Sequence, residues 1–325
     1  MIATKENIFP KKYRGRLTEG VTYDYRTNSL LWIDIIAGEV HRINATDGTN
    51  HEILKWESPT ESIGAIGLTS NPDIILVCSK YGVAYGNFIN STLEYFFKYP
   101  HDESQQIRLR SNDGIIDPWG NLWIGVMNDF KIAKNEGIQP EGGLYRITPD
   151  LKFEKMIGDA LISNGLGFNE KGDEFYWTDS LTFKIWKFSY DKSTNKLSNK
   201  QPLIDLKELY PDIESPEPDG FVMTEDGDIY TCIFSSGTIL HVNNKGEEIE
   251  RIKIDNAKRI TCITTGGENN DTFYITTGHL ELETNDELIP DANNESDDDL
   301  GGFLFKIETK SNLKGQKKNI WGGKI

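Results

Sequence analysis

Five short segments of the sequence place one residue directly before a glycine, each at nearly the same distance from a following β-rich run. The five residues, which lie 10 to 13 positions before their runs, are Glu19, Ile63, Asp113, Asn164 and Asp219. Four of them carry a side-chain oxygen, and carboxylate and amide oxygens are the ligands that hard divalent cations prefer. Turn chemistry also favours Asp or Asn before Gly and explains any single pair equally well. Four such side chains at one repeated offset favour a cation site.

The β-rich runs themselves recur six times, at intervals of 44 to 54 residues. They are LLWID around Trp32, IILVC around Leu76, LWIGV around Trp123, FYWTD around Tyr176, IYTCI around Tyr230 and FYITT around Tyr274. Intervals of this size are typical of four-stranded propeller blades and are too long for leucine-rich or ankyrin repeats. The sequence therefore predicts an all-β fold, a six-bladed β-propeller with a central channel, built as a single domain from residues 1–325.

Radial repetition decides where the oxygen-bearing residues would lie. The segments that hold them precede the runs and should be the innermost strands, nearest the propeller axis. Equivalent positions of all blades converge on one mouth of the channel, so we expect the metal site there. We also expect the N-terminal segment before Glu19 to supply the outer strand of the last blade and so join that blade to the first.

Composition excludes several classes of partner. The net charge of -16 repels polyanions, and the chain has no basic stripe that could neutralise nucleic-acid phosphates or anionic lipids. We therefore expect neither nucleic acid nor membrane as a partner. The three cysteines have no C-x-x-C spacing and the N-terminus lacks the apolar stretch of a signal peptide, so we expect a cytoplasmic location.

Other catalytic signatures are missing from the sequence. It contains no G-x-S-x-G elbow, no H-E-x-x-H helix, no Walker A loop and no G-x-G-x-x-G fingerprint. The five histidines fall outside the repeated positions, and none is expected to pair with another at ligand spacing. The acidic stretch 279–301 is expected to be an enlarged loop in the last blade. It is not an EF-hand, because Ser296 stands where the sharp-turn glycine belongs.

Four longer motifs resemble the senescence-marker-protein, gluconolactonase and regucalcin family of six-bladed propeller lactonases. They are TEGVTYDYRTNSLLWIDI from Thr18, RSNDGIIDPWGNLWIGVM from Arg110, SNGLGFNEKGDEFYWTDSLTFKIWKFSYD from Ser163 and PDGFVMTEDGDIY from Pro218. Weaker agreement continues through RITCITTGG from Arg259 and GGFLFKIE from Gly301. The resemblance implies one divalent cation held by Glu19, Asn164 and Asp219. Calcium is the first choice, with Zn²⁺, Mg²⁺ and Mn²⁺ as other candidates.

The same resemblance implies a set of substrate contacts. Arg110 and Asn112 fall on the family's substrate-binding arginine and asparagine, and a looser alignment adds Glu141. The sequence departs from the family pattern where Gly20 leads into Val21 instead of proline, and where Val126 replaces the usual threonine. These departures affect the expected fit of the substrate more than the expected metal site.

The predicted function is hydrolysis of a sugar lactone, as in gluconolactonases. Two carboxylates and one amide oxygen would balance a divalent cation and leave positions open for water and substrate. In this hypothesis Asp219 also acts as the base, and Arg110 and Asn112 orient the substrate and stabilise developing negative charge. The expected partner is a small-molecule lactone, and a monomer is the default oligomeric state. Three alternatives stay open: a calcium-binding propeller without turnover, an aryl or organophosphate ester hydrolase, and a non-catalytic interaction platform.

Overall fold

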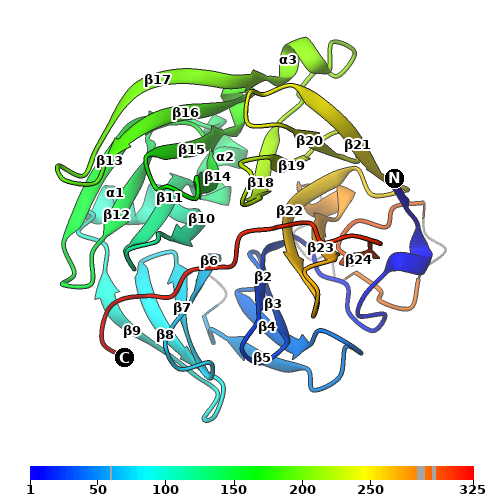
Figure 1. The fold of residues 1–325 in the computed structure, drawn as a ribbon. Coiled ribbons are helices and arrows are strands. Elements are labelled where there is room, and N and C mark those ends of the chain that lie inside the picture. Colours follow the sequence, from blue (N-terminus) through cyan, green and yellow to red (C-terminus); the bar gives the residue numbers. More distant parts are fainter. Residues whose placement is uncertain (59–60, 284–289, 295–297) are drawn as a thin grey trace.

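The computed structural model describes residues 1–58, 61–283, 290–294 and 298–325 (Figure 1). Its strands form six sheets around a central axis, which confirms the predicted six-bladed propeller. The first three blades are β2 (Thr18–Asp24), β3 (Ser29–Asp34), β4 (Glu39–Asn44) and β5 (Glu52–Lys55); β6 (Ile63–Leu68), β7 (Ile74–Ser79), β8 (Gly82–Asn87) and β9 (Thr92–Lys98); β10 (Leu109–Ile116), β11 (Leu122–Asn128), β12 (Gly142–Ile147) and β13 (Phe153–Ala160). Strands that follow one another in a blade pair antiparallel.

The other three blades repeat the same order with variations at the outer edge. They are β14 (Ser163–Phe168), β15 (Glu174–Asp179), β16 (Lys184–Asp191) and β17 (Lys196–Asp205); β18 (Pro218–Met223), β19 (Ile229–Ile233), β20 (Thr238–Val242) and β21 (Glu248–Ile254); β22 (Arg259–Gly266), β23 (Thr272–Gly278) and β24 (Phe305–Glu308). The first strand of each blade is the innermost, and each inner strand contacts its neighbours around the ring.

The second strand of each blade forms the core between blades. These strands are the predicted β-rich runs, and they hold the fully buried Trp32, Trp123 and Trp177. Aromatic side chains suit this position because they fill the wedge between two twisted sheets. The burial of the repeated runs thus explains why their spacing reveals the fold.

Short helices lie at the ends of the blades. They are α1 (Glu103–Arg108), α2 (Phe130–Glu136) and α3 (Leu206–Leu209), with 3₁₀ turns η1 (Lys5–Asn7), η2 (Ser180–Thr182) and η3 (Leu280–Glu283). None of the helices in the described part of the chain is long and apolar enough to cross a membrane.

The N-terminal segment joins two blades, which differs in part from the expectation. Strand β1 (Ile2–Ala3) pairs in parallel with β21 of the fifth blade, not with the last blade. Further on, Ile8 forms an isolated bridge with Phe305 of the last blade. Pro10 has no N–H and interrupts any longer ladder at this point. The segment therefore covers the outer edge of the fifth blade with a regular strand and that of the sixth with one bridge.

The predicted acidic insertion 279–301 lies partly outside the described residues, which do not include 284–289 and 295–297. Its two ends lie together, since the Asp299 side chain accepts a hydrogen bond of 2.8 Å from the backbone N–H of Leu280. Whether the whole stretch is one loop of a single domain stays a prediction.

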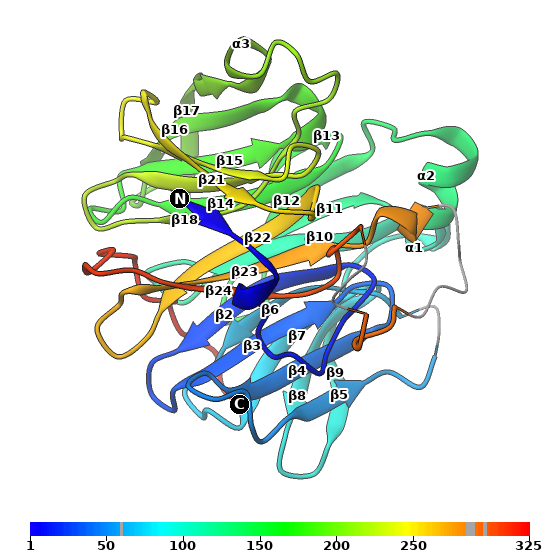
Figure 2. The same cartoon turned by 90° about the vertical axis from the view of Figure 1, so that its right-hand side faces the viewer.

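The C-terminal segment 313–322, which we call the axial strap, crosses one mouth of the channel (Figure 1, red). The backbone of Gln316 donates to Met223 O at 2.9 Å, and that of Trp321 donates to Leu68 O at 2.8 Å. Met223 and Leu68 are the last residues of inner strands of the fifth and second blades. The strap and α2 lie on opposite faces of the propeller (Figure 2).

Candidate metal centre

Every inner strand has a register shift at the same place. The shifts fall between Glu19 and Thr22, Ile63 and Ala65, Ser111 and Gly114, Asn164 and Leu166, Pro218 and Phe221, and Ile260 and Ile263. A bulge of this kind releases a side chain from the alternation of the strand and redirects it, and bulges are frequent next to active sites. The repeated bulge therefore explains why the residue before each glycine can face the channel.

The glycines have a role that turn chemistry does not describe. A Cβ atom on Gly165 would lie 2.6 Å from the backbone oxygen of Asp219, and one on Gly64 would lie 2.4 Å from that of Asn112. Of the five glycines in the repeated pairs, only Gly20 has a positive φ, of 59°. The glycines mainly let neighbouring inner strands approach closely, and this close packing brings side chains of different blades together.

The three predicted metal ligands lie at the mouth opposite the strap. Glu19, Asn164 and Asp219 are buried, with exposed fractions of 7%, 6% and 6%. One oxygen of Glu19 accepts a hydrogen bond of 2.7 Å from Gly20 N, and the Asn164 amide nitrogen donates to Ser180 Oγ at 3.2 Å. The Oδ1 atom of Asp219 is buried without a hydrogen-bond partner among the described residues. An unpaired carboxylate oxygen in the interior is costly, and a ligand would remove that cost.

The electrostatics of this mouth are those of crowded carboxylates. Burial, followed by the charge of Asp113, raises the pKa of Glu19 to about 8. Burial, followed by the charges of Glu19 and Asp113, raises the pKa of Asp219 well above its usual value. Burial also raises the pKa of Asp113 to about 6, although the Lys318 ammonium of the strap acts in the opposite direction. Each carboxyl is therefore protonated more readily than it would be in water.

These side chains fit a hard cation with oxygen ligands. No group of three or more His, Cys, Asp or Glu side chains within the described ranges is placed to hold a metal ion. A cation at this mouth would therefore need the amide oxygen of Asn164 beside Glu19 and Asp219, which is a ligand set suited to Ca²⁺ or Mg²⁺. A divalent charge would also offset the repulsion between the carboxylates.

Arg110 lies next to the carboxylates but is largely engaged by the protein. Its Nη1 donates to Ser111 O and to Asn112 Oδ1, both at 2.9 Å, and its Nη2 lies 3.1 Å from Met127 Sδ. The Phe130 ring covers the guanidinium with its centroid 4.2 Å from Cζ. Burial lowers the pKa of Arg110 to about 10, against the opposing effect of nearby carboxylates. Arg110 is therefore a fixed cation beside the site, and only its Nε lacks a partner among the described residues.

The other two predicted substrate contacts also have partners within the protein. The Asn112 amide nitrogen donates to Ser163 O at 3.1 Å, which links the third and fourth blades. Glu141 has a side chain that is 38% exposed and accepts from Arg108 Nε at 2.9 Å and from Asn128 at 2.8 Å. The structure thus brings Arg110 and Asn112 to the carboxylates and places Glu141 in an ion pair at the base of segment 129–141.

Two features of the site region escape the sequence patterns. The charge of Lys318, a residue of the strap, lowers the pKa of Asp113. The course of the strap across the axis has no repeat signature in the sequence. His41 Nδ1 lies 3.0 Å from His51 Nε2, a contact between residues ten positions apart that no metal-ligand spacing indicates. In the hairpin of β4 and β5, His41 pairs with Ile53, and His51 lies two residues before Ile53. This pair is in the first blade and does not join the predicted ligands.

Comparison with known proteins finds one matching family model and relatives that align with nearly the whole chain. The family model for the SMP-30/Gluconolactonase/LRE-like region matches residues 17–279. The cell growth-regulated gene 1 protein of Candida albicans is 64% identical over 338 residues, which span 99% of this chain and 98% of that protein. The L-arabinolactonase of Azospirillum brasilense is 28% identical over 91% of this chain and 90% of its own.

A solved structure shows the same fold. The calcium-binding protein regucalcin of Agrobacterium tumefaciens superposes with a TM-score of 0.79 at 21% identity, over 99% of both chains. The similarity extends around the whole ring of blades. The matched family model and the relative of 64% identity establish that this chain belongs to the SMP-30/gluconolactonase family.

Proposed function

We propose that this protein is a metal-dependent hydrolase that opens a lactone ring, with one divalent cation held by Glu19, Asn164 and Asp219. The observation that carries the proposal is the buried Oδ1 of Asp219, which lacks a hydrogen-bond partner in the described ranges and lies beside a second buried carboxylate. The description of the family and the name of the Azospirillum relative support a lactone as substrate. Oxygen ligands favour Ca²⁺, with Mg²⁺, Mn²⁺ and Zn²⁺ as alternatives.

The residues of the mouth divide the chemistry between them. A bound divalent cation would supply Lewis acidity, which polarises the lactone carbonyl and acidifies water. Asp219 takes a proton from the water that attacks the carbonyl carbon. The ester C–O bond of the ring then breaks, and the leaving oxygen takes up a proton, so that the product is a hydroxy acid.

Arg110 and Asn112 assist the attack of water on the carbonyl carbon. The buried guanidinium of Arg110 stabilises the negative charge that develops on the carbonyl oxygen, because a fixed charge in a poorly solvated site needs little reorganisation. Asn112 accepts from Arg110 Nη1 and so holds the guanidinium in place. Glu141 remains a proposed substrate contact, and its pair with Arg108 would have to open for it to act.

A second candidate is a protein that binds calcium without turnover. The internal hydrogen bonds of Arg110 and Asn112 favour it, because side chains already engaged by the protein are less available to a substrate. This candidate shares the proposed cation site and differs only in the absence of hydrolysis.

The test combines metal binding with a lactone assay. Protein stripped of metal with a chelator receives Ca²⁺, Mg²⁺, Mn²⁺ or Zn²⁺, and acid release is followed on a panel of lactones, including aldonolactones. We expect metal-stimulated hydrolysis that falls at least about 100-fold in Asp219→Asn. The matched control is Asp212→Asn, an exposed aspartate of the same blade connection, which should keep full activity.

Calorimetry of Ca²⁺ binding distinguishes the outcomes. Binding with hydrolysis supports the proposal. Binding without hydrolysis of any lactone supports the calcium-binding candidate instead. If the wild-type protein neither binds a divalent cation nor hydrolyses a lactone, both candidates are wrong.

A further inference from the structure

At the end of the blades that holds the proposed site, every blade has a large apolar or aromatic residue at an equivalent position. Each inner strand begins opposite the end of the second strand, as in the pairs Thr18–Asp34 and Leu109–Asn128. One or two residues after the last pair, at the start of the turn that follows, stand Ile36, Tyr81, Phe130, Leu181, Phe234 and Leu280. We call these six residues the mouth collar. All six are partly exposed, whereas the predicted ligands beneath them are buried.

Three members of the collar that come from different blades pack against one apolar cluster. Ile36, Phe130 and Phe234 belong to the first, third and fifth blades, yet all three pack against the same apolar cluster. Phe130 also lies over the Arg110 guanidinium at 4.2 Å. Phe234 donates its backbone N–H at 2.9 Å to Glu217 O, two residues before Asp219. Phe130 and Phe234 therefore lie next to residues of the predicted site, and we expect a substrate to contact them on its way to the carboxylates.

The side chains predicted to contact the substrate already have partners within the protein. Both Nη atoms of Arg110 and the amide nitrogen of Asn112 are engaged by the protein. Glu141 is paired with Arg108. A hydroxyl group that loses water without gaining a partner weakens binding, whereas an alkyl group gains free energy by burial against apolar side chains.

We infer that the mouth collar selects lactones whose ring carries an apolar substituent over lactones of polyhydroxylated sugars. The inference rests on the proposed lactonase activity and names its substrate class. The lactone carbonyl reaches the Asp219 end of the site, and the substituent packs against Phe130, Phe234 and Ile36. Each methylene that becomes buried should raise kcat/KM about threefold to fourfold until the collar is filled.

The first experiment compares two series of substrates with the metal-loaded protein. One series consists of γ-lactones whose alkyl substituent grows from methyl to hexyl, and the other consists of aldonolactones. We expect kcat/KM to rise with chain length and to exceed that of the aldonolactones. A flat dependence on chain length, with aldonolactones turned over faster, overturns the inference and leaves the lactonase proposal intact. No turnover in either series overturns both.

The second experiment uses the side chains of the collar. Phe234→Ala should lower kcat/KM for the hexyl lactone about tenfold, mainly through KM, with little change for the methyl lactone and none in Ca²⁺ binding. Phe234→Leu should restore most of the loss. The matched control is Phe96→Ala, which removes a partly buried ring that stacks on Tyr85 in the second blade. An equal loss for all chain lengths would show a merely structural role and contradict the inference.

Discussion

Individual side chains show how this fold concentrates charge in its interior. Glu19, Asp113 and Asp219 come from three blades, and burial is the first cause of the raised pKa of each. The buried guanidinium of Arg110 interacts electrostatically with both Glu19 and Asp219. Burying three neighbouring carboxyl groups lowers the stability of the folded protein. Such a loss of stability is typical of a site that binds a ligand.

A carboxylate of the first blade has a lowered pKa, and this leads to a prediction for the dependence of stability on pH. Glu39 lies 3.4 Å from His41 Nε2 and 2.7 Å from Lys55 Nζ. The nearby His41 imidazole, assisted by Lys55, lowers the pKa of Glu39 from 4.5 to about 2. Between these values the folded state binds fewer protons than the unfolded state, so this contribution is present above pH 4.5 and is lost toward pH 2.

The substitution Glu39→Gln should therefore make the free energy of unfolding less dependent on pH in the acid range. In urea unfolding, the wild type should lose about 1 kcal/mol more than the variant as the pH falls through this window, after allowance for solvent screening. Glu57→Gln, which changes an exposed residue just after β5 of the first blade, is a control for general charge effects. Parallel pH profiles of the wild type and Glu39→Gln would refute the assignment.

The predicted site illustrates what can be learned about single residues from the sequence. The residue–glycine spacing places Glu19, Asn164 and Asp219 at equivalent positions, because blades repeat the same geometry, and the resemblance to a family then assigns them to a metal. The cover of Phe130 over Arg110 was not predictable. It depends on the path of segment 129–141 and on side-chain rotamers, which have no repeated signature.

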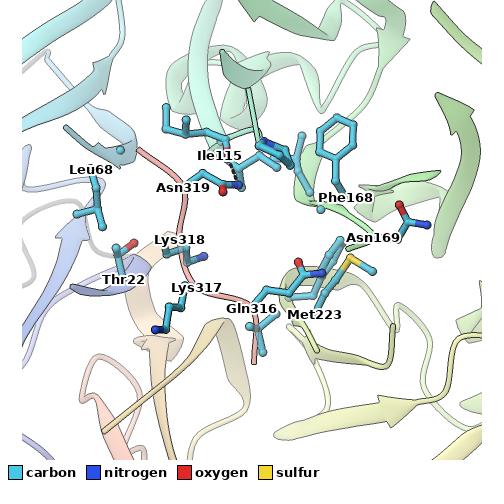
Figure 3. Close-up of a pocket in the computed structure, with 18 of the residues that line it drawn as sticks. Thr22, Leu68, Ile115, Phe168, Asn169, Met223, Gln316, Lys317, Lys318 and Asn319 are labelled. Carbon is cyan, nitrogen blue, oxygen red and sulfur yellow. Dashed lines mark hydrogen bonds between the residues drawn. The ribbon is translucent and has the colours of Figure 1, made fainter. Parts of the chain in front are cut away.

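At the scale of elements, bulges and the axial strap complete the channel. The bulges of the inner strands could not be located from the sequence, because one extra residue leaves the alternation of a short buried strand ambiguous. The strap escapes prediction for a different reason, since it is not part of a blade. Its Gln316, Lys317, Lys318 and Asn319 line a cavity of about 350 Å³ with the ends of the inner strands (Figure 3).

The strap buries one large aromatic side chain, which gives a prediction for stability. Trp321 is 3% exposed and packs in a core cluster of the second and third blades. Trp321→Ala should lower the free energy of unfolding by about 3 kcal/mol, because it leaves a cavity where an aromatic ring was buried. Urea denaturation followed by circular dichroism measures the change.

The neighbouring residue of the strap is a suitable control. Ile320 is 40% exposed, so Ile320→Ala should change the free energy of unfolding by less than about 0.5 kcal/mol. Equal effects of the two substitutions would mean that the strap contributes through its backbone and not through the buried ring.

The whole molecule is a ring that is closed by its N-terminal segment. In the first twelve residues, Ala3 and Ile8 are buried in the core of the fifth and sixth blades, with exposed fractions of 0% and 3%. The sequence predicted that this segment closes the ring. It could not reveal which blade receives the regular strand, because both outer edges offer unpaired backbone groups.

Deleting residues 1–12 should therefore lower the melting temperature by about 5 °C or more, because buried apolar contacts and the pairing of β1 with β21 are lost together. Differential scanning calorimetry measures the shift. Lys12→Ala changes an exposed residue of the same segment and should melt as the wild type does. A deletion variant with an unchanged melting temperature would show that the ring is stable without this segment.

The contacts that close the ring join residues that are very distant in the sequence. Ile2 pairs with Lys253, Ile8 bridges to Phe305, and Leu68 bridges to Ile320. Each blade can form from its own hairpins, whereas these contacts require loop closure over most of the chain, which is entropically costly and slow. Folding should therefore pause at a state of formed blades and open edges. In that state β21 and β24 present unpaired backbone groups. Strand pairing with an exposed edge of a second copy of the chain would then compete with ring closure.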